Sequence, residues 1–406
     1  MSSSRSRQCV QFILVLLILF AAPAFAAERG GKGKVIARAQ ALQGTAAVDC
    51  NKITARTKSR PSAPRTSESL AEVGAPVKLN DESTPALTAG VWSPNGDSIA
   101  FVAPTNRVQA LKGEAVTALA GDPNHAPSRA VGVSVNEIWL YQFHNKAWSR
   151  VSADGAVPRF SKDGKRLLYL SSSKGARAVD METLADEPLG ASEAGDPNHR
   201  FQTALLSDGS VLSPGPSGGV LRQVVGNESA WASIELAPQD EIRIAPNEQR
   251  IAVIYNAGEK NPGSAVVVYD RAGTATTVLK NCPASALHLT WSQDGKSLAY
   301  AMRAAGQPEV WQSNLSGGPP QTRVRLQSSE GIGALSLSPD NEFVAFAQTS
   351  HTGKESIWIA SKAGRQRIAS GLLGQWSFQG DRLLYAARLP GGGFDWYVVP
   401  VTLRNQ

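Results

Sequence analysis

A short turn motif recurs along most of this chain, and it constrains the fold more than any other feature of the sequence. The clearest copy lies in residues 287–302, LHLTWSQDGKSLAYAM, where alternating apolar residues end at Trp291, a polar reversal follows, and a second alternating stretch returns. Such alternation on both sides of an Asp-Gly turn predicts a β-hairpin. Six further copies, of differing completeness, occupy residues 93–96, 161–164, 206–209, 245–248, 338–341 and 377–380.

The spacing of the copies predicts how the hairpins assemble. The residues directly before the turns lie at 92, 160, 206, 244, 291, 337 and 376, so most copies are 38 to 47 residues apart. Further strand-like stretches follow most copies, for example residues 309–312 and 323–326. Four short strands in about 40–50 residues is the period of propeller blades. We therefore predict an all-β fold, a seven-bladed β-propeller, with a six-bladed ring as the alternative.

Both ends of the repeat region indicate how the ring closes. The seventh repeat ends with the strand-like residues 395–399 and has no fourth strand, whereas residues 76–80 form a strand-like piece just before the first repeat. We predict that this piece completes the last blade, because closure removes an open sheet edge; the alternative is an irregular lead-in. The first repeat is longer than the others, and we expect its surplus residues, between Pro104 and Ser134, to form a long loop or a short helix.

The first residues have the layout of a secretory signal. Residues 1–26 contain a short basic start, an apolar run from Phe12 to Phe20, and small residues that end in Ala-Phe-Ala. A retained membrane anchor is the alternative, but the apolar run is short for a span. The sequence thus predicts a signal peptide (1–26), an arm (27–75) and the propeller (76–406), with bacterial-type export to the periplasm or the medium.

The formal charge of +7 is located in the arm. Residues 28–66 hold nine Lys and Arg against Glu28 and Asp49, so the propeller region is close to neutral. Because the arm has few large apolar residues, we expect it to be largely disordered. It is the part of the chain suited to contact an anionic lipid, cell-wall or nucleic-acid surface.

Removal of the signal leaves two cysteines, Cys50 and Cys282. In an exported protein, such a pair predicts a disulfide, which here would tie the arm to the loop that enters the fifth repeat. Two unrelated thiols are the alternative.

The repeated phrase Trp-Ser-Pro-Asn/Asp-Gly, followed by a strand of the Ile-Ala-Phe type, resembles the propeller repeats of TolB, the periplasmic component of the Tol–Pal system. It is also similar to the blades of prolyl oligopeptidase-type enzymes and, more broadly, to WD-like repeats. TolB-like proteins place a mixed α/β domain before six blades, and the oligopeptidases add an α/β-hydrolase domain, whereas this sequence shows neither. The resemblance implies an exported propeller and leaves the partner open.

No convergent catalytic set is evident in the sequence. Residues 215–219 satisfy Gly-x-Ser-x-Gly but lie in a Pro/Gly-rich loop between strands, which favours a hairpin turn over a nucleophile elbow. The positions before the anchors, which we expect near the central channel, contain Arg159 and Arg243 and no acid. With His288, these arginines are candidates for binding an anion or a partner; the alternative is pairing with neighbouring acids such as Glu241.

A six-residue phrase, Ala-Gly-Asp-Pro-Asn-His, occurs twice. Asp-Pro-Asn is a good turn starter, so a repeated turn is the simpler interpretation, and a polar or metal-binding patch is the alternative. The candidate residues of that patch are Asp122, Asn124, His125, Asp196, Asn198 and His199.

These patterns predict a non-enzymatic exported propeller that binds a protein partner in the cell envelope, or another extracellular component, through a rim or channel mouth. We predict no catalytic residue, no metal and no cofactor. The alternative function is a hydrolase or lyase that acts at the central channel and depends on a metal held by the loops.

Overall fold

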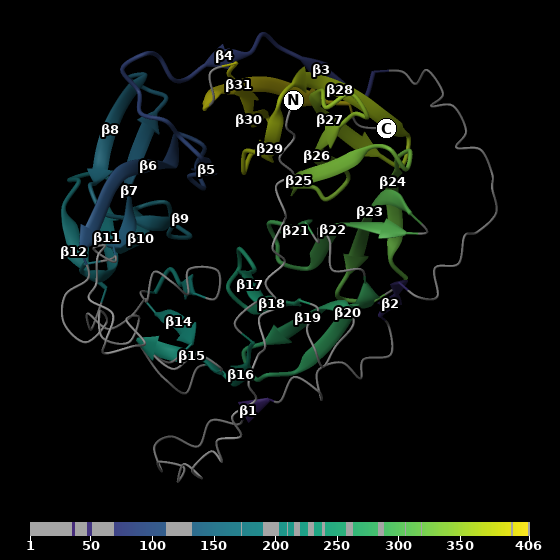
Figure 1. Ribbon diagram of the computed structural model, residues 1–406, viewed down its shortest axis with the longest axis horizontal. Coiled ribbons are helices and arrows are strands. Elements are labelled where there is room, and N and C mark those ends of the chain that lie inside the picture. The colour runs from purple at the N-terminus through teal and green to yellow at the C-terminus, as the bar shows by residue number, and fades with distance from the viewer. Residues whose placement is uncertain are drawn as a thin grey trace, which may run out of the picture. The chain divides into compact units, whose positions relative to one another are not determined.

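The computed structural model divides the chain into residues 1–32 and the unit Gly33–Gln406, and every statement below concerns that second unit (Figure 1). The structure describes residues 35–36, 47–50, 69–110, 132–171, 173–189, 203–208, 210–214, 220–225, 231–237, 240–256, 263–282, 288–304, 306–317, 319–390 and 393–404.

The described residues form strands and no α-helix, which confirms the all-β prediction. The strands lie in seven sheets, numbered here in chain order. Sheet 1 contains β5 (Ala89–Trp92), β6 (Ser98–Ala110), β7 (Gly132–Gln142) and β8 (Ala147–Ser152). Sheet 2 contains β9 (Ala156–Phe160), β10 (Arg166–Ser171), β11 (Gly175–Asp180) and β12 (Asp186–Pro188). Sheet 3 contains β13 (Ala204–Leu205), β14 (Val211–Pro214), β15 (Val220–Val225), β16 (Ser233–Glu235) and β1 (Val35–Ile36).

Sheet 4 contains β17 (Glu241–Ile244), β18 (Arg250–Tyr255), β19 (Ser264–Asp270), β20 (Ala275–Cys282) and β2 (Val48–Asp49). Sheet 5 contains β21 (His288–Trp291), β22 (Ser297–Ala304), β23 (Gln307–Asn314) and β24 (Gln321–Arg325). Sheet 6 contains β25 (Gly331–Leu337), β26 (Val344–Thr349), β27 (Glu355–Ser361) and β28 (Gly364–Ser370). Sheet 7 contains β29 (Leu372–Trp376), β30 (Arg382–Arg388), β31 (Phe394–Leu403), β3 (Ala71–Val73) and β4 (Val77–Lys78).

Consecutive strands within each sheet pair antiparallel, as the hairpin pattern predicts. In sheet 5, for example, Trp291 lies opposite Leu298, and Tyr300 lies opposite Trp311. The strands expected at residues 309–312 and 323–326 fall within β23 and β24. In Figure 1 the sheets of this unit follow one another in chain order around a common centre.

The buried apolar side chains form clusters between neighbouring sheets, not within single sheets. One such cluster lies at each junction of successive sheets in the described part of the chain. The cluster that contains Trp92 and Phe101 of sheet 1 also contains Trp396 and Val398 of sheet 7, so the last sheet packs on the first. Because burial of one large apolar side chain stabilises a fold by about 1.5–3 kcal/mol, these junctions hold the sheets together.

The last sheet takes its outer strands from the N-terminal side of the chain. In β4, Val77 pairs antiparallel with Val398 of β31 and Lys78 pairs with Tyr397. The Leu79 N–H donates to the Trp396 carbonyl at 2.8 Å. The prediction that residues 76–80 add a strand to the last sheet is therefore confirmed. Farther along β31, β3 forms a second antiparallel pairing.

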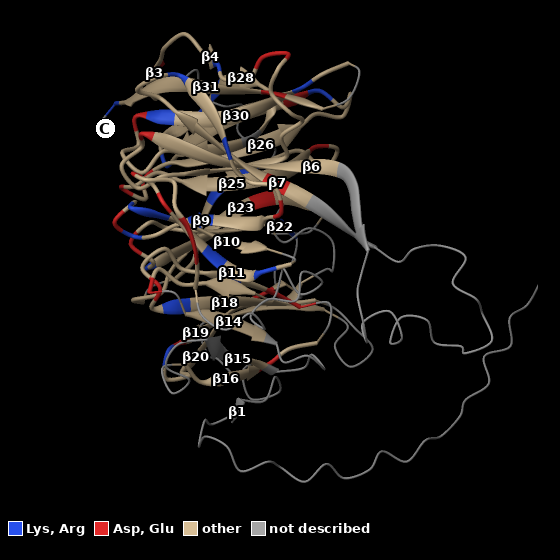
Figure 2. Ribbon diagram, turned by 90° about the vertical axis from the view of Figure 1, so that its left-hand side faces the viewer, with Lys and Arg blue, Asp and Glu red and all other residues tan. Residues whose placement is uncertain are grey.

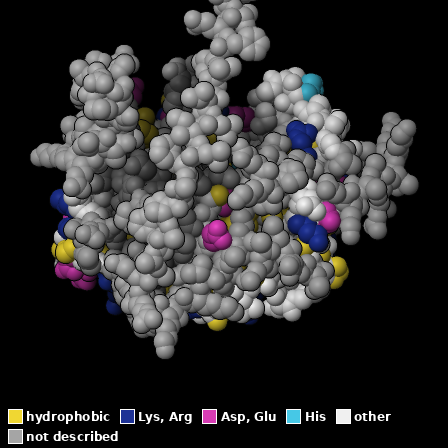
Figure 3. All heavy atoms as spheres, turned by 60° about the horizontal axis from the view of Figure 1, so that its bottom comes forward, with side chains coloured by type: hydrophobic (Ala, Val, Ile, Leu, Met, Phe, Trp, Pro, Cys, Tyr) yellow, Lys and Arg dark blue, Asp and Glu magenta, His cyan; other side chains and the backbone are white. Residues whose placement is uncertain are grey.

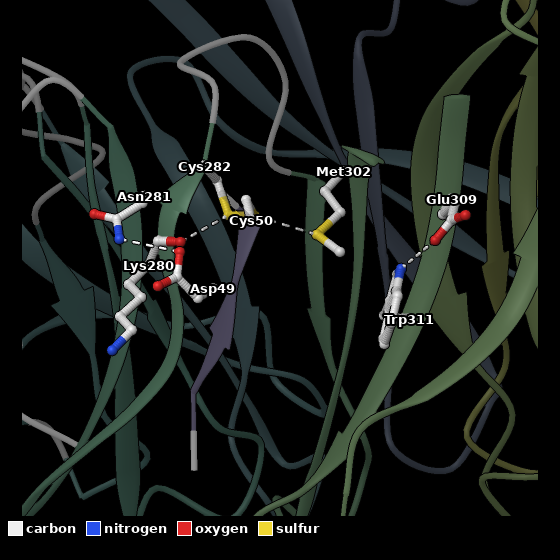
Figure 4. Close-up of a disulfide and its surroundings, with 8 residues drawn as sticks. All are labelled: Asp49, Cys50, Lys280, Asn281, Cys282, Met302, Glu309 and Trp311. Carbon is white, nitrogen blue, oxygen red and sulfur yellow. Dashed lines mark hydrogen bonds between the residues drawn. A yellow bond between two sulfur atoms is a disulfide. The ribbon is translucent and has the colours of Figure 1, made fainter. Parts of the chain in front are cut away.

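Two strands farther upstream were not predicted from the sequence. β1 pairs parallel with β16, the outer strand of sheet 3, and β2 pairs parallel with β20, the outer strand of sheet 4. Directly after β2, Cys50 forms a disulfide with Cys282, the last residue of β20, with the two Cα atoms 5.0 Å apart (Figure 4). Met302 Sδ of sheet 5 lies 3.7 Å from Cys50 Sγ. The disulfide thus lies at the junction of sheets 4 and 5.

The surplus of the first repeat is partly strand, not loop. β6 continues to Ala110, and Val108 pairs with Ser134 at the start of β7, so the strands of this hairpin are longer than those of the other sheets. Paired backbone groups satisfy each other, which favours this extension of the strands over a loop. Among the described residues, no helix has the length and apolar character that a membrane crossing would need.

Candidate functional site

In sheets 1, 2, 5, 6 and 7 the recurring motif forms one type of turn, in which a serine hydroxyl accepts the backbone N–H five residues further on. In sheet 5, the buried Ser292 hydroxyl donates to Asp294 Oδ1 at 2.6 Å and accepts the Ser297 N–H at 2.8 Å. The Lys296 N–H donates to the same carboxylate oxygen at 3.0 Å, and Gly295 has φ of 66°, a left-handed conformation that favours glycine. Ser, Asp and Gly recur in the sequence because the turn needs a small buried hydroxyl, a short acceptor and a positive φ.

These turns all lie between the first and second strands of their sheets, and we call them together the turn rim. It comprises residues 93–97, 161–165, 206–208, 245–249, 292–296, 338–342 and 377–381. In Figure 2 the turn rim lies along the left-hand edge, and Lys, Arg, Asp and Glu are mixed along it.

Arginines connect consecutive turns of the rim. Counting the turn's first residue as zero, position five is arginine in sheets 2, 4 and 7. Arg166 Nη2 donates to the Ser207 carbonyl at 2.8 Å, Arg250 Nη1 to the Gly295 carbonyl at 3.4 Å, and Arg382 Nη2 to the Gly96 carbonyl at 3.0 Å. Each guanidinium therefore reaches the turn of the next sheet.

The junction of sheets 7 and 1 is reinforced in the same way. The Arg382 guanidinium lies 5.2 Å from the ring centroid of Trp92 and 4.9 Å from that of Phe143, which is the geometry of a cation–π contact. Gln379 Nε2 also donates to the Pro94 carbonyl at 2.9 Å. These contacts fix the first turn of the rim against the last.

The first predicted anion-binding residue, Arg159, is held in an ion pair at the rim. Its Nη2 lies 2.8 Å from Glu248 Oε1, and its Nη1 donates to the Leu205 carbonyl at 2.6 Å. The Glu248 carboxylate also accepts the Ser207 N–H at 2.8 Å. Burial lowers the pKa of Arg159, and the charge of Glu248 opposes that shift. This group links sheets 2, 3 and 4.

Arg243 and His288 lie on adjacent first strands, β17 and β21. Arg243 Nη2 pairs with Glu241 Oε2 at 2.8 Å, the acid named as the alternative partner in the sequence. Burial lowers the pKa of His288, and the charge of Glu241 opposes this shift. Arg243 therefore pairs with Glu241, whereas Arg159 pairs with Glu248. A role of these residues in binding an anion stays a prediction.

Sequence reasoning missed a cavity of about 330 Å³ on the turn rim, at the junction of sheets 5 and 6. It is lined by Lys296 and Ser297 of sheet 5 near the turn, by Arg323 of β24, and by Asn341 of the next turn. The lining also includes Asp294, Glu342 and Lys362, so three cationic side chains face two carboxylates. A volume near 300 Å³ is at the lower end of the range of small-molecule sites.

Charges of both signs are visible on the face drawn in Figure 3. In this space-filling view, dark blue Lys and Arg and magenta Asp and Glu are interspersed where described side chains are visible. The lining of the cavity likewise combines both signs, with three cationic side chains and two carboxylates.

Two features singled out in the sequence lie outside the described residues. They are the patch of Asp122, Asn124, His125, Asp196, Asn198 and His199, and the Gly-x-Ser-x-Gly segment at 215–219. Within the described ranges, no group of three or more His, Cys, Asp or Glu is arranged to hold a metal ion.

Comparisons with known proteins inform the fold. No protein-family model matches the chain, and no curated protein matches it. Among solved structures, the oligogalacturonate lyase of Vibrio parahaemolyticus superposes with a TM-score of 0.52 at 11% identity, covering 81% of this chain and 96% of that one. The β-propeller domain of the Trilobed protease of Pyrococcus furiosus superposes with a TM-score of 0.51 at 12% identity, covering 77% and 94%.

TolB of Acinetobacter baumannii also matches, at 16% identity over 66% of this chain and 61% of that one, but its TM-score of 0.39 is too low to carry an argument. Identities this low show the fold and not the activity. Together with the arrangement of the sheets, they show that the chain has a fold of the β-propeller kind.

Proposed function

We propose that the chain is an exported seven-bladed β-propeller. The seven sheets, the apolar cluster at each junction, and the packing of sheet 7 on sheet 1 support seven blades in a closed ring. The pairing of β4 with β31 supports closure by an N-terminal strand.

We infer export because residues 1–26 have the layout of a signal peptide. The destination would be the periplasm or the extracellular medium. The disulfide between Cys50 and Cys282 supports this proposal, because such bonds persist mainly in oxidising compartments. The basic residues of the arm would contact an anionic surface of the envelope.

The function that we propose is non-enzymatic binding of another envelope or extracellular component through the turn rim. One observation carries this proposal: side chains in a turn, or directly after it, donate to the backbone of the next turn, as Asn247 does to Asp294 at 2.7 Å and Arg382 does to Gly96. A rim fixed in this way loses little conformational entropy when it binds a partner, which favours affinity.

A hydrolase or lyase that acts at the central channel is the alternative. Its support is the likeness to an oligogalacturonate lyase, which concerns the fold. No group of described residues favours it over the binding function.

The proposal is tested by a pull-down from envelope extract with the mature protein, with and without a chelator, followed by mass spectrometry. We expect one strongly enriched protein in both conditions. Reversal of two exposed rim charges, Lys162→Glu with Glu342→Lys, should abolish the enrichment, whereas Thr352→Lys, in the turn at the opposite end of β26, should preserve it. An empty pull-down with one metal ion copurifying per chain, or equal capture by the rim variant, would overturn the proposal.

A further inference from the structure

Short N-terminal strands extend three of the seven sheets at their outer edges. β1 adds in parallel to β16 of sheet 3, and β2 adds in parallel to β20 of sheet 4. In sheet 7, β3 and β4 pair with β31. Sheets 1, 2, 5 and 6 have four strands each within the described ranges, so β8, β12, β24 and β28 are their outermost strands there. The outer edges of this fold therefore accept a further strand, and not all of them have one.

An aromatic residue occupies one register position on the third strand of four sheets. It is Trp139 in sheet 1, Trp311 in sheet 5, Trp358 in sheet 6 and Tyr397 in sheet 7, each opposite a Phe or Tyr of the second strand. The other three sheets have no aromatic residue at this position. Each tryptophan donates its indole N–H to the side chain two residues earlier, as Trp311 does to Glu309 at 2.8 Å (Figure 4). All four rings are half-buried beside the apolar cluster between their own sheet and the preceding one.

At three of these four junctions the N-terminal segments contribute to the apolar cluster. Val48 of β2 and Cys50 pack with Trp311, Leu79 directly after β4 packs with Trp139, and Leu70 and Ala71 pack with Tyr397. The cluster beside Trp358, between sheets 5 and 6, contains residues of those two sheets only, as far as the chain is described. The edge next to this junction is β24, the outer strand of sheet 5 (Figure 1). A strand added there would occupy the place that β2 has at sheet 4.

Cationic side chains flank the edge of β24. Arg367 of β28 lies opposite Trp358 and so shares its face of sheet 6, and the Arg365 guanidinium lies 4.9 Å from the centroid of the same ring. On β24 itself, Arg325 uses its Nε to bind Glu309, whereas its two Nη atoms have no partner among the described residues. Glu309 is buried and also accepts from Trp311, so its carboxylate is already occupied. The exposed guanidinium groups at this edge thus favour an acidic ligand.

The backbone of β24 also has groups to offer. The Leu326 N–H donates inward to the Pro308 carbonyl at 2.9 Å. Because successive N–H groups of a strand point to opposite sides, the Arg325 N–H points towards the open edge. Pairing with β24 of a second copy would set arginines against arginines, which disfavours that occupant. Residues 51–68 of this chain carry five Lys and Arg against one acid, so the same repulsion disfavours them.

We propose that the outer edge of sheet 5 binds an extended acidic segment of another polypeptide by strand addition. The segment pairs with β24 through the backbone, in parallel, as β1 and β2 pair with the fourth strands of sheets 3 and 4. An apolar side chain of the segment covers Trp358, and its carboxylates bind Arg325 and Arg367. This surface is separate from the turn rim, and the proposal does not depend on binding at that rim.

The test uses a fluorescein-labelled octapeptide of alternating valine and glutamate as the probe, with the mature chain and its disulfide intact. Fluorescence anisotropy at low salt should show saturable binding at micromolar concentrations. Two control peptides should bind at least about tenfold more weakly. One has lysine in place of every glutamate. The other keeps every charge but has N-methylated backbone amides, which cannot donate to a strand.

Two matched variants and a crosslink locate the site. Arg367→Gln should weaken binding of the valine–glutamate peptide about tenfold or more, while the protein stays folded by circular dichroism. Arg150→Gln should bind as the wild type does, because Arg150 lies opposite Trp139 as Arg367 lies opposite Trp358, but at the junction where β4 is already present. A peptide with benzoylphenylalanine in place of a central valine should crosslink to residues of β24, β27 or β28, as mapped by mass spectrometry.

Four results would overturn the proposal. The first two are a folded wild type without saturable binding of the peptide, and binding of the N-methylated peptide within about threefold of the parent, which would mean attraction of charges without strand addition. The third is a set of crosslinks confined to the turn rim or to sheets 1–4. The fourth is binding about tenfold tighter after replacement of residues 53–66 by a Gly/Ser linker of equal length, which would assign the edge to this chain. None of these results depends on capture of a protein at the turn rim, so the two proposals fail separately.

Discussion

Replacement of Cys50 by alanine should destabilise the whole fold, because the disulfide closes a long stretch of chain. The two cysteines are 232 residues apart, and for a loop of that length the chain-entropy relation gives about 5 kcal/mol at 25 °C. Disulfides commonly contribute less than this relation gives, so we expect the free energy of unfolding to fall by about 3–5 kcal/mol.

The assay is urea unfolding followed by tryptophan fluorescence, for the wild type and for Cys50→Ala, with and without reductant. Reductant should lower the urea midpoint of the wild type to near that of the variant and should leave the variant unchanged. Cys50→Ala is preferred to Cys282→Ala because Cys282 is buried in the cluster between sheets 4 and 5, where truncation would also create a cavity. A loss below about 1 kcal/mol, or an equal effect of reductant on both proteins, would refute this reasoning.

Three further predictions concern the fold and are measured by the same unfolding assay. Gly295→Ala should cost about 2–4 kcal/mol, because a Cβ at that position would lie 2.5 Å from the side-chain amide nitrogen of Asn247. Gly306→Ala, also at positive φ but with open space around it, should cost about 1 kcal/mol. Leu79→Ala, which removes a buried side chain from the junction of sheets 7 and 1, should cost about 2–4 kcal/mol, against about 0.5 kcal/mol or less for the exposed Leu184→Ala. Burial raises the pKa of Tyr300 from 10.0 to about 12. The stability that the neutral phenol contributes is therefore complete below pH 10 and is lost as the pH rises towards 12. Tyr300→Phe should flatten that part of the plot of unfolding free energy against pH.

The turns could be predicted from the sequence because their information is local. Ser292, Asp294 and Gly295 each stabilise the backbone of their own turn, so a few adjacent residues are enough to predict its conformation. The apolar alternation on either side then fixes which face of each strand is buried, and the regular spacing gives the number of repeats.

The upstream strands could not be predicted in the same way. β1 and β2 are two residues long, pair parallel, and join sheets whose strands lie about 200 residues later. Such pairs leave no periodicity in the sequence. The two cysteines were the one signal in the sequence. They indicate the position of β2 because Cys50 directly follows that strand.

The contacts between consecutive turns have a partial signal that alignment of the repeats would reveal. Arg166, Arg250 and Arg382 occupy position five in sheets 2, 4 and 7, whereas sheets 1 and 5 have Ser98 and Ser297 there and sheet 6 has Phe343. The function of these arginines becomes evident only when their guanidinium groups are seen on the next turn. Pairing of Arg159 with Glu248 has no such signal, because it joins residues of sheets 2 and 4.

The most direct test of the binding function is site-specific photo-crosslinking in living cells. A photoreactive residue would replace either Lys162 or Gln379, both exposed on the turn rim, or Gln327 or Thr352, both exposed beyond the opposite ends of the strands. We predict that the two rim positions crosslink to the same envelope component and that the two opposite positions do not. Crosslinks confined to the opposite positions, or none at any position in a correctly exported protein, would contradict the claim that this propeller binds its partner through the turn rim.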